Sequence, residues 1–255
     1  MHRFIIPDAQ FATDQIVKLP DEVLKHLRTV LRLGVGAQCL LCDGAGLVAR
    51  AEILDDYCAR VQSVASLPAA DCHLTLLQGM PKGEKLELVL QKGTELGVNQ
   101  FLLTPMARSV GRLKAERAGK RMQRWQKIVL EAARQSGQPY LPQVLPQQSF
   151  VRALTAVEAD LKLLLWEESG RPLSQVLPSA APRSIIVGVG PEGGITPEEA
   201  GKAEKAGYLP VSLGPRILRT ETAGLAVMAI LQYLYGDLTK GRCSDQAADQ
   251  GKDES

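Results

Sequence analysis

The sequence predicts an α/β protein in which a small β-rich module precedes a parallel sheet covered by helices. Two observations support this. Up to about residue 70, short strand-like runs are separated by turn residues, with one helical segment among them. From residue 72 onward, short apolar runs alternate with helical segments, the order that produces parallel strands. With 255 residues, 45% of them hydrophobic, the chain is long enough for such cores.

The first module, residues 1–70, is expected to be a small barrel. Its predicted strands are 4–6, 15–19, 37–42, 46–54 and 60–66. A helix is predicted at 20–32 because apolar residues recur there at helical spacing. Its expected inward residues are Val23, Leu24, Leu27, Val30 and Leu31, and its expected outward residues include Lys25, His26, Arg28 and Arg32.

The second domain, residues 72–238, follows a linker at 67–71. Strands are predicted at 74–78, 101–104 and 161–166, and helices at 84–96, in the latter part of 108–134, and at 150–158. Residues 139–146 are expected to be a loop or an extended crossing. The polar composition of residues 239–255 predicts a disordered tail.

Two loops follow buried strands near the C-terminal end. The run 185–189 is apolar and β-branched, and Gly188, Gly190, Gly193 and Gly194 follow or end it, where the backbone can approach a ligand closely. Thr196, Pro197 and Glu199 then form the expected start of a helix, with a capping box. The second loop lies between a short strand at 211–213 and an apolar helix at 221–235, which is expected to be buried in the core or against a partner subunit.

These loops do not have phosphate-binding chemistry. A P-loop requires a Lys-Ser/Thr pair after its last glycine, where Ile195 and Thr196 stand here. A dinucleotide loop is disfavoured because Glu192 would repel a pyrophosphate. The loop is therefore predicted to hold a ligand without phosphates.

Charge and cysteine content restrict the remaining functions. The net charge is only +2, so nucleic-acid affinity would need a local basic cluster, and residues 108–134 provide one with Glu116 and Glu131 as its only acidic residues. No apolar run has the length of a membrane span or of a secretion signal, so we expect a cytoplasmic protein without membrane contact. The five cysteines have no framework spacing, which indicates reduced structural thiols and no metal site.

Several motifs resemble one known family. The segments are Arg28–Arg32, Gln91–Gly97, Trp125–Gly137, the Gly-Pro-Glu-Gly-Gly run at 190–194, and Leu213–Ala223. Together they resemble the RsmE family, the rRNA uridine-N3 methyltransferases of the SPOUT superfamily, over nearly the whole chain. Gly93 stands where that family commonly has alanine, and a glycine inside a helix should cost about 1 kcal/mol.

The resemblance implies a fold, a cofactor and partners. The fold would be a SPOUT-type parallel sheet with a C-terminal trefoil knot, preceded by a PUA-like RNA-binding barrel. The cofactor would be S-adenosyl-L-methionine, and the partners would be 16S rRNA or the small ribosomal subunit and a second copy of the chain in a homodimer. The implied cofactor-binding residues are Leu165, Gly188, Gly190, Glu192, Gly193, Leu213, Gly214, Arg216, Ile217 and Leu218. The expected RNA-binding residues are Arg3, His26, Arg28 and Arg32, which match family positions, together with Arg121 and Arg124 from the basic segment.

The implied reaction is methyl transfer to N3 of a uridine, which requires removal of a proton and stabilisation of negative charge on the base. Arg219 is the first candidate for the stabilising residue, with Glu192 and Glu221 as secondary catalytic candidates. Two alternatives remain open from the sequence: a non-catalytic RNA-binding factor in ribosome assembly, and a Rossmann-like nucleotide enzyme. The sequence does not identify the target nucleotide, the general base, the order of binding, or whether naked rRNA or an assembled particle is the substrate.

Overall fold

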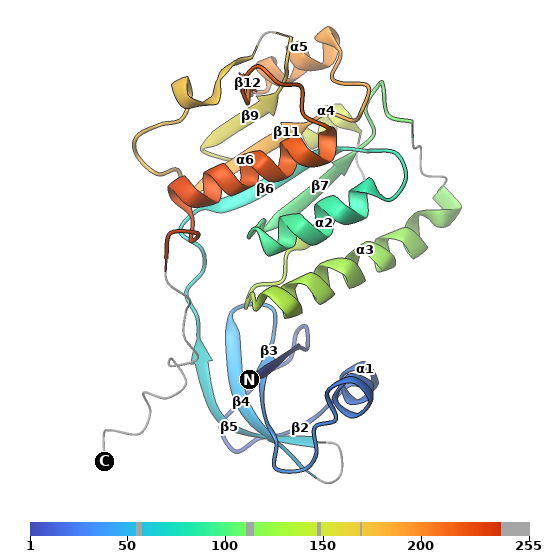
Figure 1. Ribbon diagram of the computed structural model, residues 1–255, viewed down its shortest axis with the longest axis vertical. Coiled ribbons are helices and arrows are strands. Elements are labelled where there is room, and N and C mark those ends of the chain that lie inside the picture. The colour runs from blue at the N-terminus through green and yellow to red at the C-terminus, as the bar shows by residue number, and fades with distance from the viewer. Residues whose placement is uncertain (55–57, 111–114, 147–148, 169, 241–255) are drawn as a thin grey trace. The chain divides into compact units, whose positions relative to one another are not determined.

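The computed structural model describes residues 1–54, 58–110, 115–146, 149–168 and 170–240 (Figure 1). From residue 241 onward, the predicted disordered tail lies outside the described residues. Two compact units can be separated. The first contains Met1–Ala69 and Ala133–Leu141, and the second contains Ala70–Ala132 and Pro142–Lys240.

The first unit contains a curled five-stranded sheet in the order β1-β3-β4-β5-β2. The strands are β1 (His2–Ile5), β2 (Ile16–Lys18), β3 (Gln38–Cys42), β4 (Leu47–Ile53) and β5 (Cys58–Ser66). β1 pairs parallel with β3, and the other pairs are antiparallel. A change of register between Arg50 and Ala51 marks an irregularity that can bend β4. All five strands occur where the sequence predicts them.

The predicted helix at 20–32 is divided in two. A short α-helix, α1 (Asp21–Lys25), continues as a π-helix, η1 (His26–Leu31), and Arg32 ends it in the left-handed region at φ 51°. A π-helix has a wider turn than an α-helix, so residues beyond His26 rotate away from the 3.6-residue pattern. Leu27 remains buried, but Val30 is 63% exposed, and the prediction that Val30 faces inward is wrong.

A segment distant in sequence completes this unit. In Ala133–Leu141, Tyr140 forms an isolated bridge with Ala45 and donates its hydroxyl to the carbonyl oxygen of Leu67 at 2.8 Å. Gly46 lies against the Tyr140 ring, where a side chain would not fit. The sequence gives no sign of this contact because Tyr140 is far along the chain.

The second unit is built on a seven-stranded, all-parallel sheet in the order β10-β12-β9-β11-β6-β7-β8. Its strands are β6 (His73–Gly79), β7 (Gln100–Thr104), β8 (Gln143–Leu145), β9 (Leu161–Leu165), β10 (Arg171–Pro172), β11 (Ser184–Val189) and β12 (Leu209–Ser212). The apolar runs that predict strands are fully buried at the centre of the sheet, as expected for parallel strands covered on both faces. The parallel α/β fold is therefore confirmed. This order of strands does not establish whether the chain is knotted, and the knot stays a prediction.

Helices cover both faces of this sheet. On one face, α4 (Phe150–Ala153) and α5 (Pro197–Lys205) pack on a core that includes Leu77, Leu102, Leu164 and Ile186. On the other, α2 (Lys85–Glu95) and α6 (Thr220–Tyr235) lie side by side, and Leu76 faces Gly224 of α6. Leu76 and Leu77 thus point to opposite faces, as alternate strand residues do. α3 (Ala115–Ser136) carries the basic segment.

Four elements differ from expectation. Residues 143–145, within a predicted loop or crossing, form the edge strand β8, and the strand β10 and the 3-10 helix η2 (Leu173–Gln175) were not predicted. α4 ends at Ala153 although a helix to residue 158 was predicted. Thr155 explains this end, because its hydroxyl and its amide both donate to the carbonyl oxygen of Arg152, which competes with helical bonding.

α6 buries one face only. Val227, Met228 and Leu231 are buried, whereas Tyr233 and Leu234 are 63% and 50% exposed. One face of the helix therefore packs in the core, one of the two locations predicted for it. No helix among the described residues is long and apolar enough to cross a membrane.

Buried thiols fit the structural role predicted for the cysteines. Burial raises the pKa of Cys39 and of Cys42 to about 11, and it raises that of Cys72 to a similar value. These thiols are therefore protonated at neutral pH and react weakly. Cys243 lies outside the described residues.

Alanine should have opposite effects on stability at two of the helical glycines, Gly93 and Gly119. A Cβ at Gly93 in α2 would lie 2.8 Å from Cε1 of Phe101. A Cβ at Gly119 in α3 would have no described atom within 4 Å apart from the adjacent residues and the nearby backbone of its own helix. Gly93→Ala should therefore lower the free energy of unfolding, because overpacking against Phe101, which costs about 1–3 kcal/mol, outweighs the gain in helix propensity expected from the sequence. Gly119→Ala should raise it by about 0.5–1 kcal/mol through helix propensity. Urea unfolding midpoints measure both, and a stabilised Gly93→Ala variant would contradict this account.

Candidate active site

A pocket lies at the carboxyl ends of β9, β11 and β12, where open parallel sheets usually bind ligands. Three chain segments line it: the end of β9, the glycine loop at 190–195 after β11, and the connection from β12 to α6. The lining residues are Leu165, Trp166, Glu167, Val189, Gly190, Gly194, Ile195, Val211, Ser212, Leu213, Gly214, Arg216, Ile217, Leu218, Thr220 and Ala223. The lining is mainly backbone and aliphatic, with Glu167 and Arg216 as its charged members.

Local interactions fix the glycine loop. Gly190 lies so close to Ile195 that an added Cβ would be 2.6 Å from Cγ1 of Ile195, and Gly194 has a φ of +75°, which favours glycine. The predicted capping box is present: the hydroxyl of Thr196 accepts from the Glu199 amide, and the Glu199 carboxylate accepts from the Thr196 amide. Glu199 also accepts a 2.7 Å bond from the Ala107 amide, which ties the start of α5 to the segment after β7.

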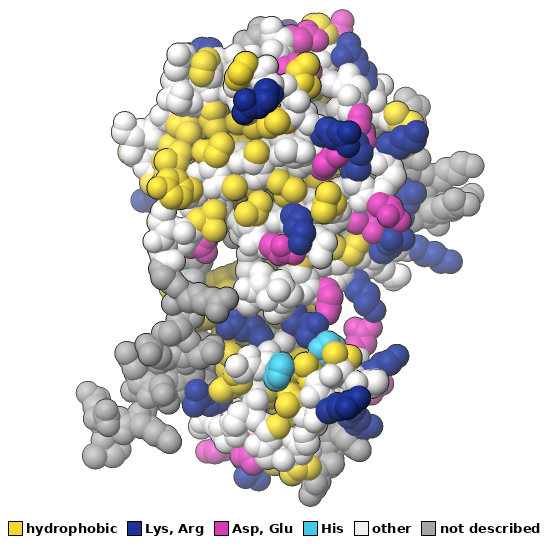
Figure 2. Space-filling model, in the orientation of Figure 1, with side chains coloured by type: hydrophobic (Ala, Val, Ile, Leu, Met, Phe, Trp, Pro, Cys, Tyr) yellow, Lys and Arg dark blue, Asp and Glu magenta, His cyan; other side chains and the backbone are white. Residues whose placement is uncertain are grey.

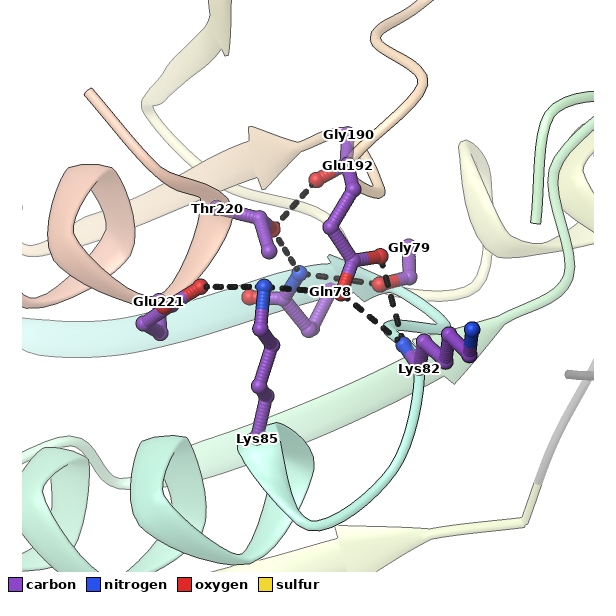
Figure 3. Close-up of polar contacts among 8 residues, drawn as sticks. All are labelled: Gln78, Gly79, Lys82, Lys85, Gly190, Glu192, Thr220 and Glu221. Carbon is purple, nitrogen blue, oxygen red and sulfur yellow. Dashed lines mark hydrogen bonds and ion pairs between the residues drawn. The ribbon is translucent and has the colours of Figure 1, made fainter. Parts of the chain in front are cut away.

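A buried hydrogen-bond chain joins three segments beside the pocket (Figure 3). The side-chain amide of Gln78, at the end of β6, donates to the Thr220 hydroxyl at 3.0 Å, and that hydroxyl donates to the Gly190 carbonyl oxygen at 2.5 Å. Gln78 is fully buried and Thr220 is 6% exposed. This chain fixes the position of the first turn of α6 relative to the glycine loop.

A group of charges, which we call the Lys85 cluster, lies next to this chain and contains Lys85, Glu192 and Glu221. The Lys85 ammonium is 3.0 Å from Oε1 of Glu192 and 3.4 Å from Oε2 of Glu221, and the Lys82 amide donates to both Glu192 oxygens at 3.1 and 3.2 Å (Figure 3). Burial opposes ionisation of Glu192, but hydrogen bonds from its own amide, Lys85 and the Lys82 amide hold its pKa below the ordinary value. The hydrogen bond to Glu192, and the contacts with Glu221, raise the pKa of Lys85. The net effect favours the charged forms of Lys85 and Glu192.

The predicted cofactor residues fall into two groups. Seven of them line the pocket: Leu165, Gly190, Leu213, Gly214, Arg216, Ile217 and Leu218. The other three, Gly188, Glu192 and Gly193, do not. A Cβ at Gly188 would lie 2.8 Å from Cδ1 of Leu164, and one at Gly193 would lie 2.7 Å from Cβ of Arg108. These glycines allow close packing of neighbouring side chains, and Glu192 is held by the Lys85 cluster.

The catalytic candidates lie at the start of α6 and in the glycine loop. Arg219 is the exposed N-cap residue of α6, between the pocket-lining Leu218 and Thr220, and its side chain makes no capping bond. Glu221 lies in the first turn of the same helix. Because the pKa of Glu192 is lowered, that carboxylate is a poor proton acceptor, which favours a positioning role for it.

Sequence reasoning did not select Ser212, Thr220 or Ala223 as site residues, although all three line the pocket. The resemblance also implies that the strand end at 165–167 belongs to the pocket, and Trp166 and Glu167 do line it. The indole N–H of Trp166 is buried and has no hydrogen-bond partner among the described residues. The described residues also contain no group of three or more His, Cys, Asp or Glu side chains placed to hold a metal ion.

The predicted RNA-binding residues lie in both units, each considered by itself. In the first unit, His26 contacts the Phe4 ring edge-on at 6.2 Å and lies 2.9 Å from Nη1 of Arg134. Arg28 and Arg32 are exposed, and Arg3 is half-buried near Gly137. In the second unit, Arg121 and Arg124 are exposed on α3, and Arg124 forms a 2.7 Å ion pair with Glu87 of α2.

Two family models match the chain. The model described as an RNA methyltransferase domain matches residues 68–232, which contain the whole pocket. The model described as an RNA methyltransferase PUA domain matches residues 19–56 of the first unit.

Curated relatives and solved structures agree with these matches. Ribosomal RNA small subunit methyltransferase E of Bacillus subtilis is 32% identical over 250 residues, covering 91% of this chain and 96% of the relative. The protein of the same name from Mycobacterium tuberculosis is 34% identical over 217 residues, covering 82% and 83%.

Two solved structures contain a bound cofactor. One is a ribosomal RNA small subunit methyltransferase E from Neisseria gonorrhoeae bound to S-adenosylmethionine, with a TM-score of 0.84 and 35% identity, covering 94% of this chain and 100% of that one. The other, from Legionella pneumophila and described as a methyltransferase in complex with the same cofactor, has a TM-score of 0.84 and 30% identity, covering 92% and 98%. By sequence and by fold, the chain belongs to the family of ribosomal RNA small subunit methyltransferase E.

Proposed function

We propose that this protein transfers a methyl group from S-adenosylmethionine to N3 of a uridine in 16S rRNA. The observation that carries the proposal is the pocket at the ends of β9, β11 and β12, in a chain that superimposes on relatives solved with that cofactor. A nucleotide cofactor is disfavoured, because the glycine loop carries Glu192 and lacks a Lys-Ser/Thr pair.

The residues present fit S-adenosylmethionine. A Cβ at Gly190 would clash with Ile195, so the loop presents bare backbone to the pocket at this position, and aliphatic residues such as Leu165 and Leu218 offer a surface for a flat base. The charged groups of Glu167 and Arg216 offer polar contacts to a ligand that carries both an amine and a carboxylate. Bound there, the cofactor supplies a methyl group on a positively charged sulfur. Of the predicted cofactor residues, we assign direct contact to those that line the pocket and indirect roles to Gly188, Glu192 and Gly193.

The chain itself must prepare the uridine. N3 lies on the pairing edge of the base, so the base has to be unpaired or extruded before it can react. Loss of the N3 proton leaves negative charge on the base, and the guanidinium of Arg219, exposed beside the pocket, is placed to stabilise it. Glu192 and Glu221 are turned toward Lys85, so we assign them to support of the site rather than to proton removal.

RNA contact is assigned to both units. Residues 1–70 form the RNA-binding module, with Arg3, His26, Arg28 and Arg32, and residues 72–238 form the methyltransferase domain, with Arg121 and Arg124 on α3. Exposed arginines neutralise phosphates and release counterions, which makes affinity depend on salt. Reversing the charge of Arg121 should therefore reduce the slope of log affinity against log salt concentration, and an unchanged slope would remove it from the interface.

We further propose that the protein is a cytoplasmic homodimer with a C-terminal trefoil knot. The apolar side of α6 supports dimer formation: Figure 2 shows hydrophobic side chains gathered over this helix, and Ile230, Tyr233 and Leu234 are exposed there. An exposed apolar face of this kind is typical of an interface, and a two-fold axis places the same patch on both copies. Sedimentation should give twice the chain mass, and a monomer that is fully active would contradict the dimer.

The experiment that tests the reaction is methylation of 16S rRNA in vitro. Purified protein is incubated with labelled S-adenosylmethionine and either naked 16S rRNA or small ribosomal subunits, and the modified base is mapped by mass spectrometry. One methylated uridine is expected, blocked at its pairing edge. Tight binding of the cofactor with no methyl transfer to either substrate would support the assembly-factor alternative instead.

A further inference from the structure

The Lys85 cluster joins two walls of the pocket without lining it. Glu192 lies between Gly190 and Gly194, and Glu221 directly follows Thr220; these three neighbours line the pocket, whereas neither carboxylate does. Both carboxylates are instead directed at the Lys85 ammonium, which extends from the first residue of α2 (Figure 3). Neither carboxylate is therefore placed for direct contact with a ligand, but the cluster can act on the pocket through the backbone that it positions.

The position of Lys85 is not explained by the stability of α2. A cation in the first turn of a helix is unfavourable, because the positive end of the helix dipole lies there. The carboxylates of Glu192 and Glu221 offset this unfavourable interaction with the helix dipole, because their oxygens lie 3.0 Å and 3.4 Å from the Lys85 ammonium. The Glu221 side chain is only 13% exposed, so removing its cationic partner would leave a largely buried carboxylate close to that of Glu192.

The surrounding packing makes the pocket sensitive to such a change. At Gly79 an added Cβ would lie 2.9 Å from the backbone nitrogen of Pro191, so the end of β6 is in direct contact with the glycine loop. The bonded chain from Gln78 through Thr220 to Gly190 couples that loop to α6. Repulsion between Glu192 and Glu221 would move the loop and the helix apart, and both carry pocket-lining residues.

We propose that Lys85 is a positioning residue for the methyl-donor pocket, which holds the glycine loop and the start of α6 together through Glu192 and Glu221. The proposal rests on the proposed function, because it concerns the same pocket. It assigns Lys85 to cofactor affinity rather than to contact with the uridine or the cofactor.

The test compares Lys85→Met with Lys82→Met. Lys82 is a matched control, because only its main-chain amide joins the contacts described above. Calorimetry with S-adenosylmethionine should show the Kd raised about tenfold in Lys85→Met and unchanged in Lys82→Met. In the methylation assay, KM for the cofactor should rise by a similar factor with kcat within about twofold. Lys85→Arg should restore most of the affinity, because it keeps the charge.

The pH dependence separates this role from simple packing. In the wild-type protein the Lys85–Glu192 pair stays charged across neutral pH, since the pKa of Lys85 is raised and that of Glu192 is lowered. In Lys85→Met the two carboxylates lose the cation that both contact, and protonation as the pH falls relieves their repulsion. The ratio of the Kd of the variant to that of the wild type should therefore fall between pH 8 and pH 5, whereas lost packing would give a constant ratio.

The outcomes are distinguishable. If the wild-type protein does not bind S-adenosylmethionine, the proposed function fails. If the wild type binds it, and Lys85→Met binds equally well or shows a ratio independent of pH, the positioning role is overturned. Should Lys85→Met not fold, the double variant Glu192→Gln, Glu221→Gln removes the same ion pairs without leaving like charges. It should weaken binding without the pH dependence, and wild-type affinity in it would overturn the proposal.

Discussion

Replacing Gly190 with valine should abolish binding of S-adenosylmethionine, with an increase in Kd of at least about 100-fold. A Cβ at this position would lie 2.6 Å from Cγ1 of Ile195 and 3.3 Å from the carbonyl carbon of Gly194, and all three residues line the pocket. The side chain of Ile195 is 2% exposed and has little freedom to move away. The added methyl groups must therefore enter the space assigned to the ligand or displace the loop. Calorimetry of the folded variant measures the effect.

Two other glycine substitutions serve as controls for Gly190→Val. Gly201→Ala, in α5, adds a Cβ that has no described atom within 4 Å apart from the adjacent residues and the nearby backbone of its own helix. This variant should bind the cofactor normally. Gly193→Ala places its Cβ against Arg108 rather than in the pocket, so its effect should be smaller than that of Gly190→Val. Unchanged affinity in a folded Gly190→Val variant, with its circular dichroism preserved, would remove the glycine loop from the cofactor site.

Features set by local chemistry were predictable from the sequence. The strands at 185–189 and 211–213 follow from short apolar runs bounded by glycine, and the capping box of Thr196 and Glu199 involves residues only three apart. The site could be placed at the ends of these strands because parallel strands end at one edge. The PUA-type module and the cofactor could be named only through the resemblance.

Features set by distant contacts were not predictable. The sequence cannot distinguish a glycine that approaches a ligand from one that accommodates a neighbour, and Gly188 and Gly193 accommodate Leu164 and Arg108. The sequence did not indicate a role for Lys85, because its partners Glu192 and Glu221 are distant from it in the chain. The π-helix likewise departs from the local pattern, which predicted an inward Val30 from α-helical spacing.

Removing the Arg219 guanidinium should lower kcat by about 100- to 1,000-fold, the range expected when one charge-stabilising donor is lost. Arg219→Ala should not disturb the start of α6. The Arg219 side chain makes no capping bond, and the Ala223 amide donates to its backbone carbonyl, which alanine retains. Cofactor affinity should stay within about threefold, because Arg219 does not line the pocket. Arg219→Lys should recover only part of the rate, since an ammonium lacks the planar guanidinium fork.

Arg216 provides the matched comparison, because it is an exposed arginine on the same connection but lines the pocket. Arg216→Ala should raise KM for S-adenosylmethionine more than it lowers kcat, the reverse of the pattern expected for Arg219→Ala. Single-turnover methylation of 16S rRNA at saturating cofactor separates the two effects. If Arg219→Ala retained wild-type kcat, negative charge on the uridine would have to be stabilised by another group near the pocket. If both variants lost only cofactor affinity, the connection from β12 to α6 would serve binding alone.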